Sequence, residues 1–65
     1  MNINIIEEKR KRKRISITEM CKAAEIDRTT YYKYMRNPDM MRISTWVKIT
    51  DFLGMTLQEK KESLK

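Results

Sequence analysis

Residues 15–34 read ISITEMCKAAEIDRTTYYKY, and this stretch predicts two short helices joined by a tight turn. Ser16 and Glu19 have the spacing of a capping box, in which each side chain accepts a hydrogen bond from the other residue's backbone amide. The first helix is expected over about Ile17 to Ala24. Its apolar side chains recur at helical spacing and predict one inward face, formed by Met20, Cys21 and Ala24.

The second helix of this stretch is expected from Arg28 to about Arg36, because Asp27 before it is a favoured N-cap residue. Tyr31 and Tyr34 fall on one side of that helix, which predicts that they belong to the core. The opposite side carries Arg28, Thr29, Tyr32, Lys33 and Arg36. Two short helices separated by a turn of about three residues form the skeleton of a helix-turn-helix.

Three further helices are expected around this pair. The first spans about Asn4 to Lys13, with Asn4 as the cap and Glu7 close to a capping-box position. Ser44 is expected to cap a fourth helix, and Thr56 begins a second capping box ahead of a short last helix. The apolar face of the fourth helix is formed by Trp46, Ile49, Thr50 and Leu53. We therefore expect an all-α fold, a compact bundle of about five short helices forming one domain over residues 1–65.

The composition favours a polyanionic partner and gives no sign of an enzyme. Fifteen Lys and Arg against nine Asp and Glu give a net charge of +6, which suits DNA, RNA or an anionic membrane surface. With no histidine and the single cysteine Cys21, the chain can form neither a structural zinc site nor an internal disulfide. We expect no cofactor, no metal, no catalytic residue and no small-molecule substrate. A single cysteine at an apolar helix position fits a reducing compartment, so we expect a cytoplasmic protein. The chain has no long apolar run at its start, so we expect no signal peptide and no membrane segment.

Residues 15–34, together with TWVKITDFLGM at residues 45–55, resemble the lambda-repressor/Cro-like (Xre) helix-turn-helix family. The resemblance covers about Ile15 to Leu57. It implies a recognition helix from Arg28 to Arg36 that lies in the major groove of double-stranded DNA. It also implies that the two motif helices are clamped together by Met20, Cys21, Ala24, Ile26, Tyr31 and Tyr34. The implied function is sequence-specific DNA binding by a phage-type or bacterial transcriptional regulator, with repression as the expected mode.

Two sets of site residues follow from this resemblance. The base-reading set is Arg28, Thr29, Tyr32 and Lys33, because Arg and Lys can donate to guanine and a threonine methyl can contact thymine. The phosphate-contacting set is Arg12, Arg14, Ser16, Thr30 and Arg36. The basic run Lys9–Arg14 keeps three interpretations: a phosphate-contacting patch, a solvated helix end, or the composition of a nuclear-localisation signal.

The chain departs from the family pattern at three positions. Glu25 stands in the turn where the family usually has glycine, and left-handed geometry there costs about 1–2 kcal/mol for other residues, so the turn is either strained or slightly different from the family's. Ile17 replaces a frequent glutamine, which puts one backbone contact to DNA in doubt. Lys9 replaces a frequent apolar residue, which predicts that the first helix docks loosely.

A homodimer is expected, because a chain of this length has a thin core. Apolar side chains near its end are predicted to form the dimer surface: Phe52, Met55, Leu57 and Leu64. The alternative function is a helical protein-interaction or RNA-interaction module that uses the same basic face.

Overall fold

The computed structural model describes all 65 residues, and the fold is all-α, as predicted. It contains five α-helices, one short 3-10 helix and no strand. The elements are α1 (Ile3–Arg12), α2 (Ile17–Ala24), α3 (Arg28–Arg36), η1 (Pro38–Met40), α4 (Ile43–Phe52) and α5 (Leu57–Leu64). The bounds of α2 and α3 agree with those predicted from the sequence.

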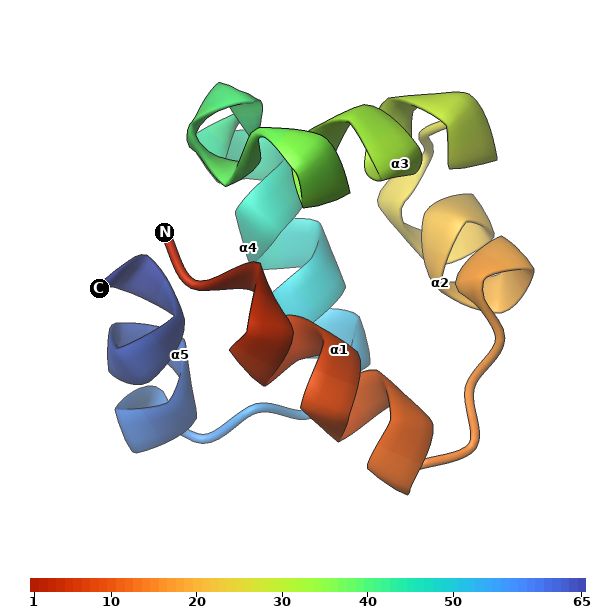
Figure 1. Cartoon of the computed structure of the whole chain (residues 1–65). Helices are drawn as coiled ribbons and strands as arrows, with labels where there is room; N and C mark the ends of the chain where they lie inside the picture. The colour runs from red at the N-terminus through yellow and green to blue at the C-terminus, as the bar shows by residue number, and fades with distance from the viewer.

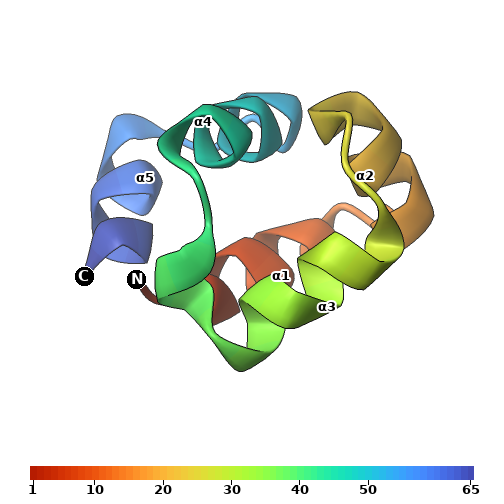
Figure 2. The ribbon, with the colours of Figure 1, turned by 90° about the horizontal axis from the view of Figure 1, so that it is seen from above.

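The helices surround a small core on all sides (Figure 1). In this view α4 runs behind α1, α2 and α5 flank them on the right and left, and α3 lies across the top. Seen from above, α3 and α4 lie on opposite sides of the molecule (Figure 2). The two termini lie side by side next to α5, where the amide of Asn2 donates to the carbonyl of Ser63 over 2.7 Å.

Four of the five α-helices contribute buried apolar side chains to this core, and α5 contributes none. The predicted inward residues of α2, α3 and α4 are buried, with Trp46 and Ile26 partly buried at the edge. The core consists of Ile3, Ile6, Met20, Cys21, Ala24, Tyr31, Tyr34, Met41, Ile49, Leu53 and Met55. Met55 therefore packs inside the molecule, and its prediction as part of an apolar surface is wrong. Its position directly after the turn at Gly54 directs the side chain back toward the core.

Two predicted helix starts are wrong. Helix α1 begins at Ile3, and Asn2 rather than Asn4 is its cap, since the Asn2 side chain accepts from the Asn4 amide over 3.1 Å. This start places Ile3 and Ile6 on one buried face. Helix α4 begins at Ile43, so Ser44 lies inside the helix and caps nothing.

Three helices end in the same way, with one residue in left-handed geometry that reverses the chain. These residues are Arg14 (φ 58°), Glu25 (φ 59°) and Gly54 (φ 64°). After each of them, the next amide bonds back to the last turn of the helix, as in a Schellman ending. The left-handed geometry that the family resemblance implies at Glu25 is confirmed, whereas the sequence does not predict that of Arg14.

Candidate nucleic-acid interface

The helix-turn-helix consists of α2, the turn Glu25–Asp27 and α3. The predicted capping box is present at the start of α2: the Ser16 hydroxyl accepts from the Glu19 amide over 3.0 Å, and Glu19 accepts from the Ser16 amide over 3.2 Å. Asp27 occupies the N-cap position of α3, but its side chain makes no capping hydrogen bond. The two helices bury their facing sides and leave one long side of α3 free.

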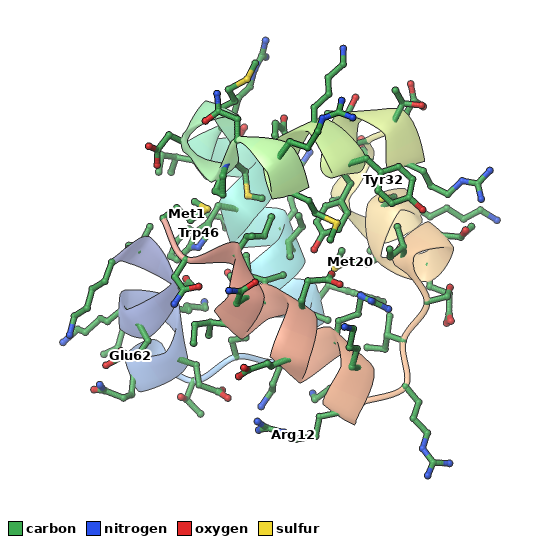
Figure 3. The ribbon with its side chains drawn as sticks, in the orientation of Figure 1. Met1, Arg12, Met20, Tyr32, Trp46 and Glu62 are labelled. Carbon is green, nitrogen blue, oxygen red and sulfur yellow. The ribbon has the colours of Figure 1, made fainter.

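That free side of α3 brings the predicted base-reading residues together. All four are exposed, and so is Arg36 at the end of the same helix. Tyr32 has 46% of its surface accessible and lies on the outside of the molecule near α2 (Figure 3). None of the cations on this side forms an ion pair, namely Arg28, Lys33 and Arg36. Their charges are therefore free to interact with an external anion.

The residues predicted to contact phosphate are more scattered. Ser16 and Arg14 lie around the start of α2, and Thr30 is half-buried on α3. Arg12 lies at the end of the molecule opposite α3, as its position below α1 in Figure 3 shows. The structure thus places Arg14, Ser16, Thr30 and Arg36 on the helix-turn-helix or next to it, and separates Arg12 from this group.

The basic run at the end of α1 is not one uniform patch. Lys9 donates to both carboxylate oxygens of Glu59 on α5, over 3.1 and 3.2 Å. The expectation that Lys9 makes the first helix dock loosely is therefore wrong, because this ion pair holds α1 against α5. Arg10 points inward and pairs with Glu7. The other four cations, Lys11 to Arg14, are exposed and form no ion pair.

Comparison with protein families agrees with this geometry. A helix-turn-helix family model matches residues 6–60, which include α2, α3 and α4 entirely. The chain belongs to the Cro-type (Xre) helix-turn-helix family. Comparisons with curated proteins and with solved structures find no match. This helix-turn-helix protein is thus a DNA-binding regulator, and α2 and α3 are its motif helices.

A buried polar cluster links α1 to α3 in this helix-turn-helix protein. Tyr31 donates from Oη to Glu7 Oε2 over 2.6 Å. Arg10 donates to the same carboxylate from Nε and Nη2, over 2.9 and 2.8 Å, and from Nη1 to the Ile15 carbonyl over 2.8 Å. The hydrogen bonds from Arg10, followed by that from Tyr31, hold the pKa of Glu7 below its usual value despite its burial. Burial and the neighbouring carboxylate raise the pKa of Tyr31.

This cluster is not among the features predicted from the sequence. The sequence predicts Glu7 near a helix cap and Arg10 in a solvated or phosphate-contacting run. Both expectations are wrong, because Glu7 accepts a hydrogen bond from Tyr31 in the interior and Arg10 pairs with Glu7. The signal available in the sequence was the Glu7–Arg10 spacing of three, which puts an acid and a base on one helix face.

The structure shows no metal-binding cluster and no ligand pocket beside this interface. Cys21 is buried, and burial raises the pKa of its thiol. No three His, Cys, Asp or Glu side chains lie close enough to hold a metal ion, and the surface has no pocket. None of the helices is long and apolar enough to cross a membrane.

Proposed function

We propose that this protein is a sequence-specific repressor that inserts α3 into the major groove of operator DNA and represses by occupying it. One observation carries the proposal: the exposed side of α3 presents its side chains in a row, with unpaired cations at Arg28, Lys33 and Arg36. On the opposite side of the same helix, Tyr31 and Tyr34 are buried in the core. A rigid helix with a free polar side suits groove reading.

The proposed roles divide by chemistry. Arg28 and Lys33 donate to guanine, and the Thr29 methyl contacts thymine, with Tyr32 beside them. The phosphate contacts come from Arg14, Ser16, Thr30 and Arg36. Arg12 contributes least to binding, because it lies at the end of the molecule opposite α3 (Figure 3). Base contacts discriminate between sequences, whereas phosphate contacts hold the protein on any duplex.

The test compares Arg28→Ala with Arg14→Ala on a preferred duplex, selected from a random pool, and on a random duplex. Arg28→Ala is expected to cost about 1–3 kcal/mol on the preferred duplex and much less on the random one. Arg14→Ala is expected to weaken binding to both duplexes by similar factors. It should also lower the slope of log K against log salt by about one, because one phosphate contact is lost.

Lys48→Ala is the matched control, since Lys48 is an exposed cation on α4 that belongs neither to the proposed DNA-contacting residues nor to the proposed dimer contact. It should leave the affinity for both duplexes nearly unchanged. If Arg28→Ala weakens both duplexes equally, α3 does not read bases in this protein. If the unaltered chain prefers structured RNA or an acidic protein over duplex DNA, the interaction-module alternative replaces the proposal.

A further inference from the structure

Only one side-chain hydrogen bond joins helix α3 to the other helices. Its buried faces pack through apolar contacts, and its N-cap residue Asp27 makes no capping hydrogen bond. The bond from Tyr31 Oη to Glu7 Oε2 is the one side-chain hydrogen bond that joins α3 to another helix. Apolar packing is non-directional, whereas a hydrogen bond restricts both distance and angle. This bond therefore restricts how far α3 can rotate or slide over α1, which lies beneath it (Figure 2).

The same cluster also reaches the start of α2. Arg10 holds the Glu7 carboxylate with two nitrogens and donates its third, Nη1, to the carbonyl of Ile15. The amide of Ile15 donates back to the carbonyl of Arg10 over 3.1 Å, so this residue is held on both sides. Ile15 directly precedes Ser16, the cap of α2. One chain of hydrogen bonds thus runs from α3, through α1, to the residue before α2.

We propose that Glu7, Arg10 and Tyr31 are positioning residues that set the orientation of α3 and thereby the sequence discrimination of the protein. The proposal rests on the proposed function, in which α3 reads bases. Glu7 and Tyr31 are buried, so they act on DNA only through the helix that Tyr31 belongs to. Base contacts require placement within about 0.5 Å, whereas long side chains on phosphates adapt to a small shift.

The test removes the hydroxyl and keeps the ring. In Tyr31→Phe the aromatic packing remains, Glu7 keeps its pairing with Arg10, and only the tie between α3 and α1 is lost. Affinities for a preferred and a random duplex are measured at a temperature where circular dichroism shows the variant fully folded. The ratio of the two affinities should fall about tenfold, which is the discrimination of one bidentate base contact. Binding to the random duplex should change less than about twofold, because phosphate contacts do not need this placement.

Two further variants separate positioning from general stability. Arg10→Lys keeps the charge but cannot hold Glu7 and Ile15 together, so its affinity ratio should also fall. Ile49→Val truncates a fully buried side chain on α4, outside the cluster, and should leave the ratio unchanged.

The outcomes are distinct. An unchanged ratio in folded Tyr31→Phe and Arg10→Lys would overturn the positioning role. An equal fall in Ile49→Val would overturn it as well, because any loosening of the core would then suffice. Equal affinity of the unaltered chain for both duplexes would overturn the proposed sequence specificity itself, and the positioning role with it.

Discussion

Arg14 and Glu25 hold left-handed backbone geometry without being glycine, with φ of 58° and 59°. An L-residue with a Cβ pays about 1–2 kcal/mol for this geometry, part of which is offset because glycine has more freedom in the unfolded chain. Gly54 occupies the equivalent position after α4 without that cost. The fold therefore carries two local strains that a glycine would relieve.

We expect Arg14→Gly to raise the free energy of unfolding by about 1 kcal/mol. Glu25→Gly should raise it by about half as much, because it also removes a weak exposed ion pair of 3.6 Å to Lys48. Urea denaturation of both variants measures this. Gly54→Ala is the reverse control and should lower stability, since the new Cβ would also meet the flexible end of Lys13. A lower urea midpoint for Arg14→Gly would contradict the prediction.

Glu7 should make stability depend on acid pH. The hydrogen bonds from Arg10 and Tyr31 lower its pKa in the folded protein from the ordinary value of 4.5. A carboxyl with a lowered folded pKa stabilises the fold above its unfolded pKa and loses that contribution as the pH falls through the folded pKa. The stability difference between the unaltered chain and Glu7→Gln should be constant above about pH 4.5 and shrink below it.

Urea titrations between pH 7 and pH 3 measure this difference. Glu8→Gln is the matched control, because the carboxyl of Glu8, next to Glu7 in the chain, is exposed and forms no ion pair. A Glu7→Gln difference that stays constant down to pH 3 would show that the folded protein does not favour the ionised carboxylate.

At the scale of elements, α5 differs from the other helices because polar contacts hold it in place. Trp46 Nε1 donates to Ser63 Oγ over 2.9 Å, and Ser63 Oγ donates to the Lys60 carbonyl over 2.7 Å. Glu59 pairs with Lys9 on α1, and Lys60 pairs with Asp51 on α4 over 2.6 Å. Ser63 is fully buried at the centre of these contacts.

Ser63→Ala should therefore lower the free energy of unfolding by about 1–3 kcal/mol, because the indole N–H loses its partner in a partly buried place. Trp46 is the sole tryptophan, so its fluorescence reports directly on the docking of α5. Lys61→Ala on the exposed side of the same helix should change stability by less than about 0.5 kcal/mol. Identical unfolding curves for Ser63→Ala and the unaltered chain would show that the hydrogen bond is dispensable.

At the scale of the whole molecule, exposed apolar side chains remain around α5. Leu57 is 69% exposed, Leu64 48% and Phe52 42%. One copy spans at most 27 Å, less than the roughly 34 Å between half-sites one DNA turn apart. Two copies thus fit side by side on one face of a duplex. We propose that these three side chains form the dimer contact, without the buried Met55.

The expected result is a dimer on duplexes with two half-sites one turn apart, measured by sedimentation. Replacing Leu57 and Leu64 together by lysine should abolish the dimer and weaken binding to two half-sites far more than to one. Ile43→Lys is the control, since Ile43 is an exposed apolar residue at the start of α4. If the unaltered chain sediments as a monomer on the duplex with two half-sites as well as on the duplex with one, the proposed dimer is excluded.

Features that depend only on neighbouring residues could be predicted from the sequence. The capping box at Ser16 and the bounds of α2 and α3 follow from contacts within a few residues, whereas left-handed geometry at Glu25 is implied by the family resemblance. The inward faces of α2 and α3 follow from helical spacing, which the sequence displays directly. For the same reason the exposed side of α3 could be predicted, whereas base reading by its side chains stays a prediction.

Features that depend on residues far apart in the chain could not be predicted, because they form only when the helices pack together. Glu7 is buried because Tyr31, 24 residues beyond it, supplies a hydroxyl to the carboxylate, and the half-buried Arg10 pairs with that carboxylate. Lys9 docks α1 because Glu59 on α5 faces it. A charged residue within a basic run appears solvated until such a partner is known, since burying it is unfavourable without one. The separation of Arg12 from α3 likewise depends on how the helices pack, which local sequence patterns do not determine.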